Sequence, residues 1–480
     1  MSAIVIHWYR LDLRNSDLPA VAAVQRDGHK ILPVYILDDM AAGEWAPGGA
    51  SRWWLHHSLR ALSDAISKQG GRLLLRLGDS AEVLCELCAE VGADTVHCTR
   101  RYEPWAAEQE SLVRDKLAAS AVSLKRFPGS LLHEPGTVLT QSGDPFKVFT
   151  PFWRASLRAQ TPLPVSHQAT IWADYSGPGD TLEDWRLTPR APDWAAGWEE
   201  HWRPGEHGAQ QALNDFLEAP IADYAQGRNL PAEALTSRLS PHLHHGEISP
   251  RQVFAASEAL RVQRPDWEDA LRKFQAELGW REFSYHLLHF FPQIPEAPFK
   301  AAFSRFPWAP DNAYLEAWQR GQTGYPIVDA GMRELWHTGY MHNRVRMVVA
   351  SFLCKHLLQH WRHGADWFWD TLVDADLASN SCSWQWVAGS GADASPYFRI
   401  FNPVTQGEKF DKQGGYVRRW VPELGALPDK YLHKPWEAPQ DVLEAARVRL
   451  GANYPAPIVD HREARQRALD AYEHVKAGNS

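Results

Sequence analysis

The first 130 residues alternate short apolar runs with amphipathic segments, and this alternation restricts the fold more than any other feature. The apolar runs are expected strands, at residues 4–8, 31–37, 72–77, 95–98 and 122–127. The segments between them, near residues 52–68, 81–91 and 103–119, repeat their apolar residues with a helical period. Strands joined by helical crossovers pair in parallel and are covered on both faces. We therefore predict a doubly wound α/β domain with a five-stranded parallel sheet at residues 1–130.

The rest of the chain changes character twice. Residues 131–204 are rich in Pro, Gly, Ser and Trp, which indicates an inter-domain connector with little regular structure. From residue 205 to residue 480 the apolar residues follow a period of 3.6, so we expect an all-α domain. Its expected helices include residues 209–217, 266–291, 312–319, 328–337, 343–363 and 365–372. A chain of 480 residues is too long for one core of ordinary size, which agrees with this division.

Cysteine usage and hydropathy limit the class of protein. Five cysteines, an odd number, favour a reducing compartment over a disulfide framework. Cys85 and Cys88 would share one face of a helix, and His242, His244 and His245 lack partners at ligand spacing, so we expect no bound metal. No apolar run approaches the roughly 20 residues of a membrane span, and no targeting segment opens the chain. We expect a cytoplasmic protein.

Charge and tryptophan content bear on possible partners. The formal net charge is 50 minus 58, or −8, so DNA binding would depend on a local basic patch. The 23 tryptophans exceed what core packing explains and suggest a stacking or redox role for some of them.

In doubly wound sheets, ligands bind beyond the carboxyl ends of the strands. These ends offer residues 8–14, 38–39, 78–79 and 100–103. Neither a Gly-x-Gly-x-x-Gly after the first strand nor a P-loop is present. A nucleotide-like ligand and a purely structural sheet therefore both stay open.

Two stretches of the helical region combine groups that bind ligands. Residues 236–240 supply hydroxyls and an Arg just before Pro241, which suits either a phosphate site or an ordinary capped helix start. Glu277, Trp280 and Arg281 are three and four residues apart, so they share one helical face. An exposed ion pair on a surface helix is the alternative for this second group.

Two further stretches suit a flat ligand. Asn343, Arg346 and Met347 share a helical face, which fits a heteroaromatic ligand or a helix at a domain surface. Asp374 and Asp376 suit ribose hydroxyls, a partner arginine or helix capping. The tail at residues 397–409 mixes Arg with aromatic residues, as nucleic-acid surfaces do.

Together these stretches resemble the DNA photolyase and cryptochrome family, most closely the microbial photolyases that repair cyclobutane pyrimidine dimers. The resemblance covers nearly the whole length and is carried, in order, by WYRLDLRNSDLPA, TSRLSPHLHHGEISPRQV, ELGWREF, TGYPIVDAGMREL, MHNRVRMVVASFL, WQW and DASPYFRIFNPVTQGEKFD. It implies that residues 1–130 bind an antenna chromophore and that residues 205–480 bind FAD and DNA.

The resemblance also implies which residues bind FAD, whose reduced anionic form would be the catalyst. By motif position they are Tyr224, Thr236, Ser237, Leu239, Ser240, Arg281, Asn343, Arg346, Asp374, Asp376 and Asn380. Asn380 falls where the family sets a residue against flavin N5, and Asn there is the choice of photolyases.

The implied reaction is light-driven. The excited flavin passes an electron to a dimer flipped out of UV-damaged DNA, the cyclobutane ring opens and the electron returns. The implied catalytic residues are Glu277, Trp280, Asn343, Met347, Asn380 and Trp386. The implied electron-relay residues are Trp308, Trp361 and Trp384. The implied DNA contacts are Arg228, Trp280, Arg344, Trp386, Arg399 and Lys409. We expect the protein to be a monomer.

Alternatives remain for the substrate, the role and the antenna. Photolyases for (6-4) photoproducts carry His where Met347 stands, which counts against that substrate. Signalling of the cryptochrome type is a second alternative, against which Asn380, Met347 and the short C-terminal segment ending at Ser480 count. Trp105 and Ala106 stand where some folate-binding members have Asn-Glu, so the resemblance leaves three alternatives for the antenna. Methenyltetrahydrofolate is expected first, a deazaflavin second, and an empty site is the third alternative.

Overall fold

The computed structural model describes residues 3–166, 169–310, 313–394 and 398–477. Asn312 of one expected helix and Tyr397 of the basic, aromatic tail lie outside the described residues. The chain divides into two compact units. Unit 1 comprises Met1–Ala222, Ser237–Pro292 and Val373–Ala378, and unit 2 comprises Asp223–Thr236, Gln293–Leu372 and Ser379–Ser480.

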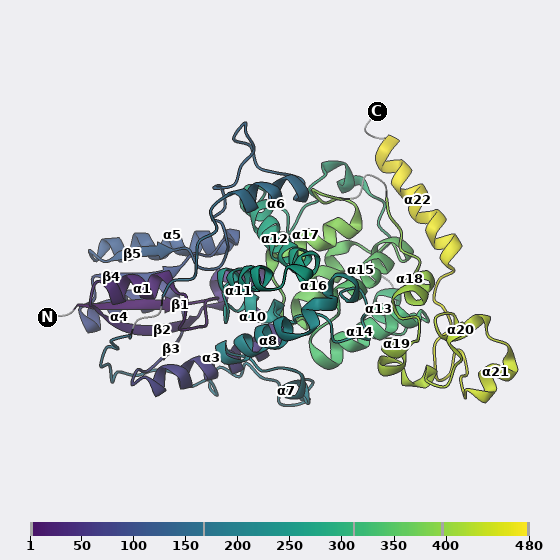
Figure 1. Ribbon diagram of the computed structural model, residues 1–480, viewed down its shortest axis with the longest axis horizontal. Coiled ribbons are helices and arrows are strands. Elements are labelled where there is room, and N and C mark those ends of the chain that lie inside the picture. Colours follow the sequence, from purple (N-terminus) through teal and green to yellow (C-terminus); the bar gives the residue numbers. More distant parts are fainter. Residues whose placement is uncertain (1–2, 167–168, 311–312, 395–397, 478–480) are drawn as a thin grey trace. The chain divides into compact units, whose positions relative to one another are not determined.

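Unit 1 contains the predicted parallel sheet (Figure 1). Its strands are β1 Ile4–Tyr9, β2 Lys30–Leu37, β3 Leu74–Leu77, β4 Thr95–Thr99 and β5 Ser123–Phe127. They pair in parallel in the order β3-β2-β1-β4-β5. The apolar runs of the central strands are nearly continuous because helices cover both faces.

Two pairs of helices cover the sheet. They are α1 Pro19–Arg26 with α3 Gly49–Lys68 on one face, and α4 Ser80–Val91 with α5 Pro104–Ala119 on the other. Val5 of β1 packs with α1 and α3, whereas Ile6 packs with α4 and α5, as the alternation of side chains along a strand requires. These elements confirm the predicted α/β fold.

Polar residues at the carboxyl edge of the sheet bind one another. Asp38 accepts hydrogen bonds from the Ser80 hydroxyl at 2.8 Å and from the Gln109 amide at 2.9 Å. Arg10 donates to the carbonyl oxygen of Thr99 and pairs with Glu110 at 2.6 Å, and these two charged side chains are 6% and 2% exposed. Arg10 thus bridges the ends of β1 and β4, where the strand order reverses and such sheets usually bind ligands.

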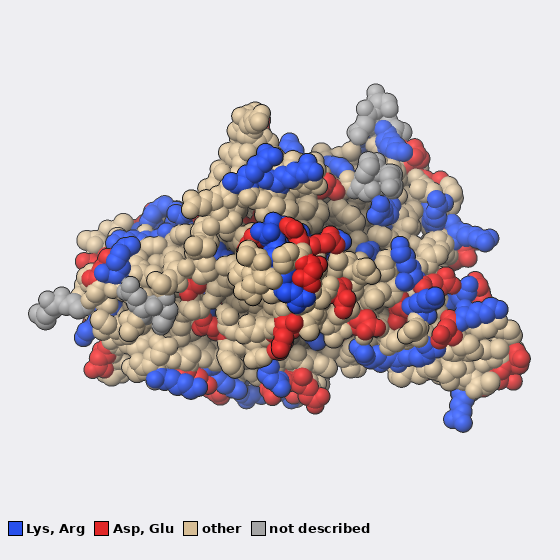
Figure 2. All heavy atoms as spheres, in the orientation of Figure 1, with Lys and Arg blue, Asp and Glu red and all other residues tan. Residues whose placement is uncertain are grey.

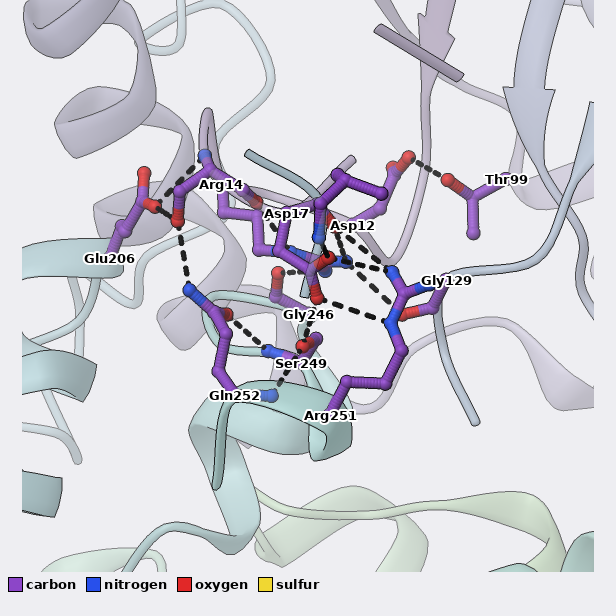
Figure 3. Close-up of polar contacts among 12 residues, drawn as sticks. Asp12, Arg14, Asp17, Thr99, Gly129, Glu206, Gly246, Ser249, Arg251 and Gln252 are labelled. Carbon is purple, nitrogen blue, oxygen red and sulfur yellow. Dashed lines mark hydrogen bonds and ion pairs between the residues drawn. The ribbon is translucent and has the colours of Figure 1, made fainter. Parts of the chain in front are cut away.

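A buried polar network ties the loop after β1 to a later helical segment of unit 1 (Figure 3). Arg14 donates to the carbonyl oxygen of Gly246 at 2.8 Å, and Asp17 accepts from Ser249 and pairs with Arg251 at 3.0 Å. Gly246 has a φ of 71°, and a Cβ there would lie 2.1 Å from a carbonyl oxygen of the loop, so a larger residue does not fit. The network holds two helices against the sheet edge: α10 Ser240–His244 and α11 Pro250–Gln263.

Further helices of unit 1 include two in a region where the sequence predicts little regular structure. They are α6 Phe149–Arg158 and α7 Trp198–His201. Phe149, Phe152 and Trp153 form the buried face of α6, which packs against α12 Glu268–Phe290. α8 Glu206–Glu218 completes the larger helices of this unit.

The described part of unit 2 is helical and contains no β-strand. Its helices are α9 Tyr224–Gly227, α13 Ala313–Gln319, α14 Pro326–Thr338, α15 Asn343–Ser351, α16 Trp361–Thr371, α18 Pro403–Phe410, α19 Gly415–Trp420, α20 Asp429–Leu432, α21 Gln440–Ala445 and α22 His461–Ala477. α17 Leu377–Ala388 begins in unit 1 and continues in unit 2. Among the described helices, none has the length and hydropathy that a bilayer span requires.

The single helix expected over residues 343–363 is interrupted, so this prediction was wrong. α15 ends at Ser351, a π-helical turn covers Phe352–His356, and Leu358 has a φ of 52°. α16 then begins behind His360, whose side chain accepts the backbone N–H of Arg362 as an N-cap. Apolar residues continue at helical spacing on both sides of the break, which hides it from a periodicity argument.

Candidate functional site

The predicted hydroxyl-rich segment ends at the start of α10 in unit 1. Pro241 stands in the first turn, where backbone N–H groups have no partner within the helix, so its lack of an N–H costs no hydrogen bond. The hydroxyl of Ser240 donates to Asp374 Oδ2 at 2.6 Å. Just upstream, Ser237 Oγ accepts the backbone N–H of the buried Leu239 at 3.4 Å. Four of the predicted flavin-binding residues therefore lie in this part of unit 1.

Asp376 is a buried carboxylate in the same unit. It accepts a hydrogen bond from the Tyr285 hydroxyl, and its Oδ2 lies 3.6 Å from His244 Nδ1. Burial alone would raise its pKa, but the charges of His244 and Arg281 and the hydrogen bond from Tyr285 hold the pKa of Asp376 well below its ordinary value. Asp376 is consequently ionised at neutral pH.

Arg281 on α12 is 13% exposed and makes several contacts within unit 1. Its Nη1 donates to the carbonyl oxygen of Ser130 at 2.7 Å, and its Cζ lies 4.9 Å from the Tyr285 ring centroid. Burial opposes its charge, yet the pKa of Arg281 lies above its ordinary value because Tyr285, Asp376 and Glu282 favour the charged form. Unit 1 thus combines a permanent cation, a permanent anion and a hydroxyl–carboxylate pair, which are groups that bind phosphates and hydroxyls.

Trp280 presents a half-buried indole on α12. Its ring lies on that of Phe149 of α6, with centroids 3.8 Å apart and planes within 8°. α6 comes this close because a Cβ at Gly279 would lie 2.6 Å from the Trp153 ring, so only glycine fits. Glu277, half-buried, stands one turn before Trp280. Phe149 was not predicted, although the apolar spacing within FTPFWRASLR was its signal.

α15 carries four predicted residues of unit 2. Asn343 is exposed, whereas Arg344, Arg346 and Met347 are half-buried. His342 caps the helix, because its Nδ1 accepts the backbone N–H of Arg344 at 3.2 Å. Burial, with the charges of Arg346 and Arg344, lowers the pKa of His342 to about 4. A neutral cap therefore fixes the turn on which these residues stand.

Arg344 belongs to a cluster of arginines. Its Nε and Nη2 both donate to Asn229 Oδ1, at 3.2 and 2.6 Å, and its Cζ lies 4.4 Å from the Phe410 ring centroid. Burial lowers the pKa of Arg344, and the nearby charges of Arg228 and Arg399 lower it further. Like charges held together by a neutral amide and a ring create a local positive field that attracts anions.

Two other predicted residues adjoin this cluster. Lys409 is exposed, with its Nζ 5.1 Å from the Phe410 ring centroid, and Tyr224 is buried with Arg228 5.5 Å from its ring centroid. Thr236, also in unit 2, is half-buried.

α17 carries Asn380 and the tryptophan pair. Asn380 Nδ2 donates to the carbonyl oxygen of Ala365 at 2.9 Å, so its Oδ1 is the acceptor that it offers to other groups. Trp384 is 2% exposed, whereas Trp386 is half-buried, as expected of residues about 200° apart on a helix. A Cβ at Gly364 would lie 2.0 Å from the Trp384 ring, so α16 approaches this indole through a glycine.

The other two predicted relay tryptophans flank a histidine. The ring centroid of His360 lies 5.6 Å from that of Trp361 and 5.1 Å from that of Trp308. Trp361 is buried, whereas Trp308 is half-buried. Burial, with the charges of His363 and Arg362, lowers the pKa of His360 to about 4. A neutral ring therefore stands between the two indoles.

The histidines that were considered as metal ligands include two with hydrogen-bond partners inside the protein. His242 binds Glu247, and His245 bonds through Nε2 to the carbonyl oxygen of Val373 at 3.3 Å. Among the described residues, no group of three or more His, Cys, Asp or Glu side chains is placed to hold a metal ion. Trp105, near the expected antenna, lies under Arg101, whose Cζ is 4.6 Å from the ring centroid.

Several known proteins are similar to this chain. A family model described as the FAD binding domain of DNA photolyase matches residues 274–474, and a model described as DNA photolyase matches residues 5–168. A deoxyribodipyrimidine photo-lyase of Agrobacterium fabrum is 51% identical over 477 residues, which are 99% of this chain and 98% of that protein.

Cryptochrome-1 of Arabidopsis thaliana is 38% identical over 491 residues, which cover 97% of this chain and 70% of that protein. A bacterial class III photolyase from Agrobacterium tumefaciens has a crystal structure that matches with a TM-score of 0.95 at 51% identity, covering 99% of this chain and 98% of that one. The chain therefore belongs to the DNA photolyase family.

Proposed function

We propose that this protein repairs cyclobutane pyrimidine dimers in DNA under light, with bound, reduced FAD. The observation that carries the proposal is the half-buried indole of Trp280, which lies on the ring of Phe149 and stands one turn from the carboxylate of Glu277. A flat apolar ring beside a hydrogen-bonding carboxylate suits a pyrimidine base, which has a π-face and polar edges. Family membership and the match to an FAD-binding domain support the same reading.

The donor groups of the chain fit FAD. Arg281 supplies a permanent positive charge for the phosphates, and the ionised Asp376 accepts hydrogen bonds from hydroxyls. Ser240 and Asp374 form a hydroxyl–carboxylate pair that extends this polar surface. The proposed flavin-binding residues are Tyr224, Thr236, Ser237, Leu239, Ser240, Arg281, Asn343, Arg346, Asp374, Asp376 and Asn380.

Asn380 has a distinct part in this proposal. Its amide N–H is engaged by the carbonyl oxygen of Ala365, so that its Oδ1 accepts a hydrogen bond from the flavin ring. FAD, when bound, absorbs the light and supplies the electron that passes to the dimer and returns. An acceptor at this position favours the reduced ring, which carries an N–H that an oxidised ring lacks.

The lesion contacts are proposed for a dimer that has left the duplex, which costs least at a damaged pair. Trp280 and Trp386 stack on the dimer, and Glu277 hydrogen-bonds to it. Asn343 and Met347, four residues apart on α15, are also proposed to contact the dimer. Phosphates of UV-damaged DNA bind the basic residues Arg228, Arg344, Arg399 and Lys409 of a monomeric protein.

Trp384, Trp361 and Trp308 are proposed to return an oxidised flavin to its reduced state. Trp384 and Trp361 are each 2% exposed, which shields them from water, and Trp308 is half-buried. The neutral His360 separates the last two rings without adding a charge that would oppose a hole on either indole.

The domain roles are also proposals. Residues 1–130 bind an antenna chromophore, residues 131–204 connect the domains, and residues 205–480 bind FAD and DNA. Methenyltetrahydrofolate is the first candidate antenna and a deazaflavin the second. Neither is assigned to the crevice between β1 and β4, because the buried pair of Arg10 and Glu110 bridges it.

Signalling of the cryptochrome type is a second candidate function, favoured by the match to cryptochrome-1 over 97% of this chain. Asn380 and Met347 support repair instead. The test is to illuminate dimer-containing DNA with the purified, reduced protein. Loss of dimers in blue light but not in darkness is expected, and dimers that persist with full flavin loading would refute the repair function.

A further inference from the structure

α6 carries unpaired positive charge on its exposed side. Arg154 and Arg158 lie one turn apart and are exposed, and the exposed Lys147 stands two residues before the helix. Within the described residues, none of these three cations forms an ion pair with a carboxylate. Figure 2 shows Lys and Arg side chains gathered over α6. In a chain of net charge −8, a local group of unpaired cations creates a local positive field that attracts anions.

The buried side of the same helix contacts the indole of Trp280, which is proposed to stack on the dimer. Phe149 opens α6 and lies flat on Trp280 at a centroid distance of 3.8 Å. Behind it, the ring of Trp153 is parallel to Phe149 within 11° at 6.5 Å. Trp280 therefore cannot tilt toward α6, and one of its faces is covered.

α6 also binds α12 at a second place. Phe152 packs against Phe283 at 5.3 Å and against His286 at 4.9 Å, and Lys147 Nζ lies 5.6 Å from the Phe291 ring centroid. The cations are thereby held on the same rigid pair of helices as Trp280. Charges fixed beside a stacking ring are the arrangement with which proteins grip a nucleic-acid backbone next to a bound base.

We propose that α6 is part of the DNA-binding surface: Lys147, Arg154 and Arg158 contact backbone phosphates beside the lesion, and Phe149 is a positioning residue for Trp280. The inference rests on the proposed function and extends the proposed DNA contacts to α6, which lies within residues 5–168 that the DNA photolyase model matches. Phosphate contacts set affinity without sequence preference, whereas the supported indole sets the preference for the dimer.

The first part of the test concerns the cations of α6 and compares two double variants of equal net charge. Arg154→Glu with Arg158→Glu changes the net charge from −8 to −12, and so does the control Lys68→Glu with Arg114→Glu on exposed positions of α3 and α5. The α6 variant should bind dimer-containing and undamaged oligonucleotides about tenfold more weakly at low salt, with a salt slope smaller by about 1.8. The control should bind nearly as the wild type does. Equal losses in both variants would overturn the proposal, since they would reflect net charge alone.

The second part of the test concerns Phe149 and measures the ratio of the affinities for dimer-containing and undamaged DNA. Phe149→Ala should lower this ratio about tenfold, because an unsupported indole stacks poorly, while affinity for undamaged DNA stays the same. Phe149→Tyr keeps a ring and should keep the ratio. Phe152→Ala is the matched control, since it removes a buried ring of α6 that does not lie on Trp280. If Phe152→Ala lowers the ratio as much, Phe149 acts through packing alone and the positioning role is refuted.

Different results would refute the proposed function and the proposed role of α6. If the wild-type protein shows no preference for dimer-containing DNA, the proposed function is wrong. If the wild type shows that preference and the α6 variants keep wild-type affinity, salt slope and ratio, only the role of α6 is wrong. Flavin absorbance of each variant confirms that the protein compared is equally loaded.

Discussion

His342 makes α15 sensitive to acid, and this sensitivity is open to a direct test. The residue is buried, its Nδ1 accepts the backbone N–H of Arg344, and it must be neutral to do so. Protonation would place a positive charge beside two arginines and remove the cap at once. Replacing His342 by Asn keeps a strong N-cap and removes the titration.

The magnitude follows from the shift in pKa. The pKa of His342 falls from 6.5 in an unfolded chain to about 4 in the folded protein. Between these values the unfolded chain binds one proton more, so the free energy of unfolding falls by about 1.4 kcal/mol per pH unit as the pH decreases, or about 3.4 kcal/mol in all. This stability is fully present above pH 6.5 and is lost as the pH approaches 4.

The assay is urea unfolding of the wild type and of His342→Asn at several values between pH 7.5 and pH 4. The difference in unfolding free energy between the two should shift in favour of the variant by about 3 kcal/mol as the pH falls. Other buried histidines of unit 2, such as His356, contribute equally to both proteins and cancel.

His360→Asn is the matched control, because His360 caps α16 in the same way and its pKa is also about 4. Both variants should gain acid stability, but only His342→Asn should keep its flavin to a lower pH, since α15 carries Asn343 and Arg346. Curves for the wild type and His342→Asn that stay parallel down to pH 4 would refute the reasoning.

Three further predictions concern the proposed chemistry. Trp361→Phe should slow photoreduction of oxidised flavin at least about tenfold in transient absorption, yet leave repair by pre-reduced enzyme nearly intact; equal loss of both would mean that the fold is disturbed. Glu277→Gln should lower the quantum yield of repair more than the flavin content, and a loss of flavin first would make Glu277 structural. Asn229→Ala should weaken DNA binding about three- to tenfold by freeing Arg344, as measured by fluorescence anisotropy, whereas unchanged affinity would show that the amide does not orient this guanidinium.

Hydrophobic periodicity was a reliable guide to the sheet. The central strands β1 and β2 are nearly continuous apolar runs because both of their faces are buried. Helix starts mark the boundaries of the runs, such as Asp79, which caps α4, and Pro104, which opens α5. The same reasoning placed Glu277, Trp280 and Arg281 on one face of α12, since helical spacing alone determines which residues share a face.

Contacts between distant residues had no such signal. Arg14 and Gly246 meet 232 positions apart, and Asp17 and Arg251 meet 234 apart, so no local pattern could pair them. α6 was missed because the Pro, Gly and Ser content of residues 131–204 indicated a connector, although Phe149, Phe152 and Trp153 have helical spacing. The contact between Phe149 and Trp280 depends on α6, so it was not predicted either.

The roles of the residues came from the family resemblance. Periodicity could place Asn380 and Trp384 on a helix, but it could not show that Trp384 is buried beside Gly364 or that Asn380 presents its oxygen. Burial and hydrogen-bond direction depend on tertiary packing, which sequence spacing does not describe.

The central claim is that an electron passes to the dimer and returns, so that no reductant is consumed. The direct measurement is the number of dimers repaired per molecule of reduced protein in blue light, without oxygen and without added reductant. The account predicts many turnovers per flavin, none in darkness, and a flavin spectrum that is still reduced at the end. Repair that stops after about one dimer per flavin, or that leaves the flavin oxidised, would contradict it.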